Sequence, residues 1–330
     1  MPTGLPQVPT LPGNGTNFND LAVAGVPIFG DLAKGIIPGP VPIGNVYFVG
    51  NRSGNVAGDG SVAGAPAATL AEVLALVAQR TGGPGDVIYI LPGHSESVDA
   101  ADWASAIGSA TYVTIIGLGS GANRPQFTWT AATSTWLFDT VGTKLVGCDL
   151  YLAGAHAAGS ALTVAAPITV SAAHCGIYGC RIWWGYDADQ IVNQGIIVTG
   201  DDFEFISNWA FAETAAQPTA TFMTLTGSDR TKIIGNDIRG VTSGTTVGVI
   251  RGLTTESLDL VVRGNVMWNK LASSTIAFSP LASSTGEFAD NYFFVNSGIL
   301  PITAGIGVWH NNYCVDTAGQ AGALVGTASS

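Results

Sequence analysis

Two groups of acidic residues lie close enough in the sequence to do chemistry together. One is Asp187 with Asp189, and the other is Asp201 and Asp202, followed by Glu204. Glycoside hydrolysis needs two carboxylates about 5 to 9.5 Å apart around one bond. Calcium-dependent elimination needs clustered carboxylates and a base that accepts the proton. The four aspartates are therefore the candidates for cleaving a polysaccharide, but we favour interpreting them as exposed turn carboxylates or a casual metal site.

The histidines and cysteines do not have the spacing of a metal site or a nucleophilic site. His94 is followed by Ser95, but adjacent strand residues point to opposite faces, so we interpret His94 as a loop residue. The four cysteines form no C-x-x-C pair, and the closest two, Cys175 and Cys180, lack companion zinc ligands. We expect reduced, structural cysteines, no metal and no cofactor.

An aromatic cluster precedes Asp187. It consists of Trp183, Trp184 and Tyr186, and since neighbouring strand residues alternate in direction, one tryptophan ring must face outward. An outward tryptophan can anchor a protein partner or stack on a sugar. We assign Trp183 and Trp184 to partner binding, with packing under a loop and sugar binding as open alternatives.

The composition excludes several classes of protein. Only 11% of the 330 residues are charged, 44 are glycine, and the mean hydropathy is +0.35. Every apolar run is nevertheless interrupted well before the roughly 20 residues that a spanning helix needs, and no secretory signal is expected. With 8 Trp, 8 Tyr and 13 Phe the chain is not disordered. A net charge of −11 without a Lys/Arg cluster argues against nucleic acid. We therefore expect an ordered, β-rich protein that binds neither nucleic acid nor a membrane.

After residue 110 the sequence repeats a short pattern that must position any functional side chain. The pattern is apolar-x-small-anchor-x-apolar, in which the anchor is Asn or a substitute, and the anchors recur every 21 to 32 residues. The anchors are Leu118, Cys148, Cys180, Asn208, Asn236, Asn265, Asn291 and Asn312. A repeat of this length without helical periodicity predicts a parallel β-solenoid, in which each coil buries its apolar face against the next.

Two apolar columns accompany the anchors. Three residues before successive anchors lie Leu145, Ile177, Phe205, Ile233, Val262, Phe288 and Trp309. Two residues after them lie Leu150, Ile182, Ala210, Ile238, Met267, Phe293 and Cys314. Both columns are predicted to face the core. The five asparagines, stacked at about 4.8 Å, are predicted to form a hydrogen-bonded ladder that satisfies buried polar groups.

The remaining segments give four parts: an arm at 1–44, entry strands and a capping helix at 45–110, the solenoid at 111–316 and a tail at 317–330. In the second part, Leu70, Val73, Leu74 and Val77 follow helical spacing over 69–80. Thr69 and Glu72 have the spacing of a capping box.

The arm carries eight of the 16 prolines and three charges, which excludes helix and favours an extended path. It is also apolar, which a solvated linker would not require. We interpret it as a segment that lies on a partner, with folding back on its own domain as the alternative. Its predicted partner-binding residues are Leu5, Val8, Leu11, Phe18, Leu21, Val26, Ile28, Phe29, Ile36 and Ile37.

The turns at Gly235–Asn236 and Gly264–Asn265 resemble the asparagine ladder of the pectin-lyase-like, right-handed parallel β-helix superfamily. The entry segment 46–96, a strand, a Gly-rich loop, one helix and GDVIYILPGHSE, resembles the start of such domains in bacteriophage virion proteins. The eight repeats predict about eight coils. The resemblance covers 46–316 and implies a right-handed β-helix with an N-terminal capping helix. Asp201–Asp202 resembles the paired aspartates of polygalacturonases, but their Gly-His-Gly and Arg-Ile-Lys motifs are absent.

The resemblance implies a structural virion protein of a tailed bacteriophage. We expect a capsid decoration or cement protein whose arm binds the major capsid protein, a homotrimer, and assembly into the virion in the host cytoplasm, without enzymatic activity. The alternative is a tail-fibre or tailspike protein that binds or depolymerises bacterial surface polysaccharide. A free polysaccharide lyase is a third possibility, which the missing catalytic base and secretion signal disfavour.

Overall fold

The computed structural model describes residues 22–23, 26–27, 44–51, 58, 60–79, 85–99, 111–153, 162–184, 190–212, 221–242, 247–296, 306–316 and 321–324. The chain divides into two compact units, Met1–Gly39 and Pro40–Ser330. In the first unit, the described residues form an antiparallel pair of β1 (Ala22–Val23) and β2 (Val26–Pro27).

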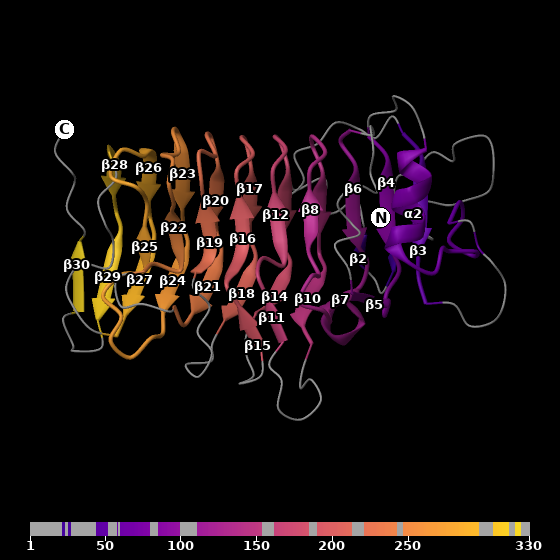
Figure 1. Cartoon of the computed structure of the whole chain (residues 1–330), viewed down its shortest axis with the longest axis horizontal. Coiled ribbons are helices and arrows are strands. Elements are labelled where there is room, and N and C mark those ends of the chain that lie inside the picture. The colour runs from indigo at the N-terminus through magenta and orange to yellow at the C-terminus, as the bar shows by residue number, and fades with distance from the viewer. Residues whose placement is uncertain are drawn as a thin grey trace, which may run out of the picture. The chain divides into compact units, whose positions relative to one another are not determined.

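The second unit is a parallel β-solenoid with three long sheets (Figure 1). In the described residues, sheet 1 contains ten strands: β3 (Val46–Val49), β4 (Val87–Ile90), β6 (Thr114–Gly117), β9 (Lys144–Val146), β13 (Gly176–Tyr178), β17 (Glu204–Ile206), β20 (Lys232–Ile234), β23 (Leu260–Arg263), β26 (Thr285–Ala289) and β28 (Ile306–His310). Each strand hydrogen-bonds to the strand from the next turn of the chain, as the order of colours in Figure 1 shows.

Sheet 2 also has ten strands within the described segments: β5 (Ser95–Val98), β7 (Gln126–Trp129), β10 (Asp149–Leu152), β14 (Arg181–Trp183), β18 (Trp209–Ala212), β21 (Asp237–Gly240), β24 (Val266–Asn269), β27 (Tyr292–Val295), β29 (Tyr313–Asp316) and β30 (Ala321–Leu324). Sheet 3 has six: β8 (Trp136–Phe138), β12 (Ile168–Val170), β16 (Gln194–Val198), β19 (Thr221–Leu225), β22 (Ile250–Gly252) and β25 (Phe278–Ser279). A short pair, β11 (Leu162–Val164) and β15 (Gln190–Val192), and a 3-10 turn, η2 (Gly121–Asn123), complete the described elements of this unit apart from one helix.

The strand register confirms both predicted inward columns. Ile177 lies opposite Leu145 and Phe205 in sheet 1, and Ile182 lies opposite Leu150 and Ala210 in sheet 2. The register continues in the same way to Trp309 and Cys314, and the members of both columns are buried. Because side chains alternate along a strand, fixing these residues inside fixes their neighbours outside.

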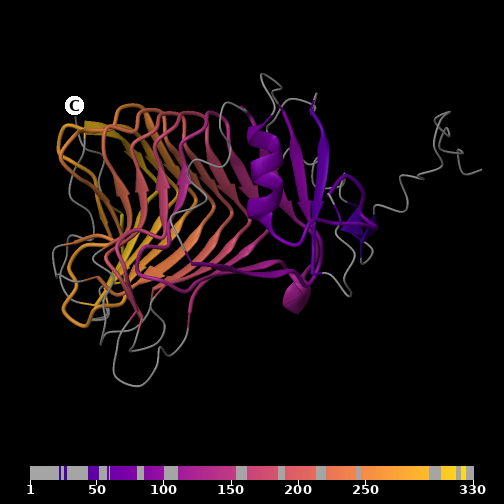
Figure 2. The same ribbon diagram turned by 45° about the vertical axis from the view of Figure 1, so that its right-hand side comes forward.

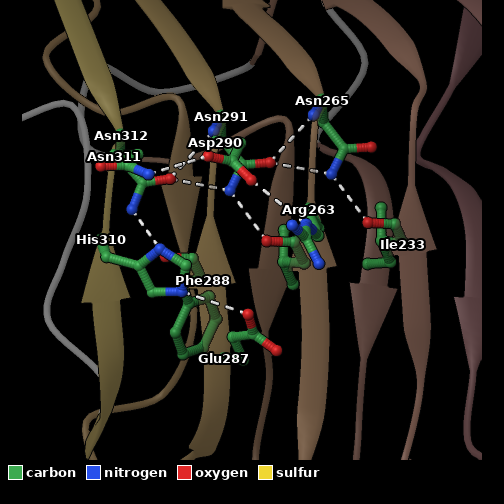
Figure 3. Close-up of polar contacts among 11 residues, drawn as sticks. Ile233, Arg263, Asn265, Glu287, Phe288, Asp290, Asn291, His310, Asn311 and Asn312 are labelled. Carbon is green, nitrogen blue, oxygen red and sulfur yellow. Dashed lines mark hydrogen bonds and ion pairs between the residues drawn. The ribbon is translucent and has the colours of Figure 1, made fainter.

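The asparagine side chains form a continuous buried ladder at the turns between sheets 1 and 2. The Asn236 side-chain oxygen accepts the backbone N–H of Asn208 at 2.8 Å and its amide group at 3.1 Å. The Asn236 amide in turn donates to the Phe205 carbonyl at 2.8 Å and to Asn265 at 2.9 Å. Figure 3 shows the same pattern running through Asn291 to Asn312. The ladder therefore satisfies polar groups that the turns bury.

A helix, α2 (Leu70–Ala78), forms within the segment where helical spacing was predicted. The Thr69 hydroxyl accepts the Glu72 N–H at 3.2 Å, while the Glu72 carboxylate accepts the Ala68 N–H, one residue earlier than a capping box requires. The apolar face of α2 is buried, and the helix lies beside β3 and β4 (Figure 2).

The sheets extend beyond the limits expected for the solenoid. In the predicted entry segment, β3 pairs in parallel with β4, and β4 pairs in parallel with β6, so sheet 1 begins before residue 111. After residue 316, β30 pairs with β29 in the antiparallel direction. The described part of the chain has about six turns with a strand in all three sheets, so the larger number of coils expected from the repeat is not established.

Asn236→Ala should destabilise the protein by about 2 to 5 kcal/mol, because it leaves the Asn208 N–H and the Phe205 carbonyl buried without partners. Chemical denaturation at neutral pH measures this loss. The control is Asn193→Ala, at an exposed position, which should change the free energy of unfolding by less than about 0.5 kcal/mol. Equal losses for the two variants would contradict a stabilising ladder.

Candidate functional site

Aromatic side chains cover the outer surface of sheet 2. In one outward row the register places Tyr151, Trp183 and Phe211 on neighbouring strands, followed by Arg239, Trp268 and Phe294. A parallel row contains Trp209, Tyr292 and Tyr313. These positions alternate with the buried column of Ile182 and its equivalents, so they face outward. We call the eight aromatic residues the outer aromatic face.

The rings of this face pack against one another. Tyr151 and Trp183 stack with centroids 4.5 Å apart and planes 5° apart, and the Trp209 ring meets Trp183 edge-on at 5.1 Å. Tyr292 and Tyr313 stack at 5.2 Å. Trp209, Tyr292 and Tyr313 are 37%, 47% and 40% exposed, respectively. Large aromatic groups held in fixed orientations and partly open to solvent are typical anchors of protein interfaces.

The charges on the same surface are neutralised within the chain. Arg181 donates to both carboxylate oxygens of Asp149, and this hydrogen bonding raises the pKa of Arg181. Arg239 donates to Asp237 at 2.8 and 2.7 Å. The Arg181 guanidinium also lies 5.3 Å from the Trp183 ring centroid, a cation–π distance. A partner could cover these ion pairs without having to supply a countercharge.

The assignment of Trp184 to partner binding is wrong. Its side chain has 0% exposure and packs edge-on against Trp129 at 5.2 Å in the core. Trp183, the last residue of β14, is only partly buried and points the other way. The alternation along the strand thus turns one tryptophan in and the other out, and the available member is Trp183.

The aspartate pair lies in the turn between β16 and β17 and is held by one arginine. Arg230 binds Asp202 at 2.8 and 2.9 Å and Asp201 at 3.4 Å. The Asp201 carboxylate also accepts the Asp229 N–H at 3.0 Å, and the His174 ring lies 3.5 Å from Asp202. The hydrogen bonds from Arg230 lower the pKa of Asp202. A general acid in glycoside hydrolysis needs a raised pKa, so this arrangement suits a structural ion pair better.

Glu204, which follows the aspartates on β17, is also committed to partners. The Tyr178 hydroxyl donates to one carboxylate oxygen, and the Lys232 ammonium lies 2.8 Å from the other. Burial raises the pKa of Glu204, but the hydrogen bonds from Lys232 and Tyr178 outweigh it, and the net shift is downward. Burial, followed by the Glu204 contact, raises the pKa of the Tyr178 hydroxyl. Glu204 therefore joins strands β13, β17 and β20 across the outer side of sheet 1.

The cysteines and His94, which could also take part in a reaction, are buried. All four cysteines are buried free thiols, and burial raises the pKa of Cys175 to about 12 and of Cys180 to about 11. His94 is buried and lies 2.9 Å from Glu96, whose carboxylate also accepts the N–H of Leu70 on α2. In the described ranges no group of three or more His, Cys, Asp or Glu side chains could hold a metal ion. None of the described helices has the length and apolarity to cross a membrane.

Several predicted site residues lie outside the described residues. They are Asp187, Asp189, Leu5, Val8, Leu11, Phe18, Leu21, Ile28, Phe29, Ile36 and Ile37. Val26 belongs to β2, but its side chain is not described. The predicted site residues with known geometry are therefore Asp201, Asp202, Trp183, Trp184 and the ladder asparagines.

Most of the outer aromatic face was missed by the sequence reasoning. Tyr151, Trp209, Trp268 and Tyr292 occupy positions one or three residues after an anchor. These positions alternate with the inward column, so the repeat contained the signal. Alignment of the outward positions of successive coils, like that of the inward columns, shows these aromatic rows.

The chain matches no protein-family model, and comparisons with curated proteins and with solved structures found no match either. The function must therefore be argued from the geometry of the described residues.

Glu204→Gln should destabilise the protein near neutral pH by about 0.5 to 1 kcal/mol, a modest loss because solvent screens the partly exposed Lys232 pair. The pKa of Glu204 in the folded protein is below its usual value of 4.5. The carboxylate therefore stabilises the fold fully when the pH is above 4.5. The contribution is lost as the pH falls through the lowered pKa. Unfolding free energies from pH 7 to 2 should therefore converge for the variant and the native protein.

The matched control is Glu256→Gln, at an exposed position, where we expect little change at either end of the range. A Glu204→Gln difference that persists undiminished at the lowest pH would mean that the charge on Glu204 contributes nothing.

Proposed function

We propose that this chain is a structural virion protein of a tailed bacteriophage, most specifically a capsid decoration or cement protein. The observation that carries the proposal is the outer aromatic face, whose rings are partly exposed while its arginines are already paired with aspartates. Such a surface fits stable contact with protein, because covering it leaves no buried charge unpaired. The arm at 1–44 binds the major capsid protein in this proposal.

The finer features of the fold belong to the same proposal. The solenoid is a right-handed parallel β-helix of the pectin-lyase-like type, with about eight coils and an extended N-terminal arm. Helix α2 is its N-terminal cap: it buries Leu70, Val73, Leu74 and Val77 and lies near β3, the terminal strand of sheet 1. A solenoid needs such a cover, because its last coil otherwise exposes apolar side chains and unpaired strand edges.

The proposed protein is a homotrimer without a cofactor, is located in the virion and is assembled in the host cytoplasm. Its acidic residues support this non-enzymatic role, since Asp201 and Asp202 bind Arg230 and Glu204 binds Lys232 and Tyr178. The net charge of −11 supports partners other than nucleic acid.

Deleting residues 1–44 should remove the protein from capsids while leaving the solenoid folded. Cryo-electron microscopy of particles assembled with the native or the truncated protein measures occupancy, and circular dichroism of the purified truncated protein checks the fold. Unchanged occupancy would refute the role of the arm in capsid binding.

The non-enzymatic role predicts that purified protein releases no oligosaccharide from host capsule or lipopolysaccharide. Chromatography of the digest checks this, with Asp201→Asn/Asp202→Asn as a second sample that should behave identically. Release by the native protein that the double variant loses would instead support the tailspike alternative.

A further inference from the structure

A second unbroken surface runs along the outside of sheet 1. In register on seven neighbouring strands lie Phe48, Tyr89, Ile116, Val146, Tyr178, Ile206 and Ile234. The next strand has Arg263 in this row. We call the seven residues the outer apolar row. Six of them are only partly buried, because neighbours shield their sides while their outer surfaces remain exposed. Tyr178 is fully buried, and its hydroxyl donates to Glu204.

The outer apolar row and the outer aromatic face adjoin each other at the asparagine ladder. From β9 onward the turns there contain two residues. The first has a left-handed conformation and is small in five consecutive turns: Gly147, Gly179, Ser207, Gly235 and Gly264. This corner therefore has little side-chain bulk. Sheet 3 differs, since its outward row mixes Leu137 and Ile197 with Thr169, Arg251 and Ser279.

We propose that copies of this chain associate by packing the outer apolar row of one copy against the outer aromatic face of the next, with the ladder corners turned toward a common axis. The contact joins two different surfaces, so it forms a closed ring when the rotation between copies closes. It rests on the proposed function only for the expectation of three copies; the two surfaces are argued from the structure.

The axial repeat favours a second copy over an unrelated protein. Both surfaces are rows of side chains spaced by the distance between strands, about 4.8 Å. A second solenoid has the same spacing, so its side chains can enter the gaps of the other copy along the whole contact. At the same height in a ring, the apolar row and the aromatic face lie opposite each other in the four coils from β9 and β10 to β20 and β21. A surface without this repeat would match over only a few strands.

Electrostatics favour the same surfaces. Two chains with a net charge of −11 repel each other. The outer apolar row has no charged member, and the outward row beside it pairs Lys232 with Glu204. On the outer aromatic face Arg181 and Arg239 are paired with Asp149 and Asp237. Contact at these surfaces therefore brings the least like charge together and buries no unpaired ion.

The available area fits a ring better than a face-to-face pair. In a ring the copies lie at the same height, so sheet 1 of one copy faces sheet 2 of the next in the nine coils from β4 and β5 to β28 and β29. Nine strands at about 4.8 Å and a strand length of about 12 Å give roughly 500 Å² for each surface. A copy in a closed ring covers roughly 1,000 Å² in its two contacts, whereas pairing two sheet 2 surfaces would cover only half of that.

Sedimentation velocity of the full chain at several concentrations tests the proposal. The native protein should sediment as an oligomer at micromolar concentration. Ile206→Glu in the apolar row and Trp183→Glu in the aromatic face should each raise the dissociation constant at least tenfold. Thr169→Glu, at a similarly half-buried outward position in sheet 3, should leave it unchanged. Circular dichroism and thermal unfolding establish that each variant is folded, and Ile234→Glu replaces any that is not.

A native protein that stays monomeric at high concentration would overturn the inference, as would an oligomer that neither variant weakens. Dissociation by Trp183→Glu alone would point to two aromatic faces in contact and would also overturn it. The proposed function fails separately: an oligomer weakened by both variants that never binds capsids leaves this contact standing, whereas a monomer that decorates capsids refutes only the contact.

Discussion

The hydrogen bonding of the buried asparagine amides is the constraint on which the rest of this structure depends. Each ladder asparagine accepts from the turn before it and donates to a strand carbonyl, as Asn265 does with Asn236 and Ile233. A turn shifted by one residue would lose these bonds and would bring outward side chains into the core. The ladder therefore fixes the register, and the register decides which side chains form the core and which form the outer surfaces.

Much of the core could be predicted because the repeat marks it twice, with an asparagine and with apolar residues at fixed distances. The outward contacts could not be predicted in this way. Arg230 meets Asp202 and Lys232 meets Glu204 across a separation of 28 residues, and only the exact stacking of turns shows that these side chains touch. The burial of Trp184 needed the same information, since its neighbour Trp183 is chemically identical. The early start of sheet 1 was hidden because β3 and β4 precede Leu118, the first anchor of the repeat.

The stacking of coils explains the low charge content of the chain. In a solenoid, a charged residue on an outward strand position stands directly beside the equivalent residue of the next turn, so like charges in one row repel each other. The chain places opposite charges in neighbouring turns, as with Asp149 and Arg181, and leaves other rows aromatic or aliphatic. Outer surfaces built in this way are suited to being covered by protein, which agrees with the proposed role in an assembly.

The two-residue turn between sheets 1 and 2 also bears on where the chain can accept insertions and deletions. It spans Gly179–Cys180 in one coil and Asn311–Asn312 in another, although the distance between anchors varies from 21 to 32 residues. Between β6 and β7 the corner is longer and contains η2, but from β9 onward all the variation in coil length falls elsewhere along the coil. Insertions and deletions can therefore accumulate away from the ladder and reshape one side of the molecule, while the corner and the two surfaces beside it keep their geometry.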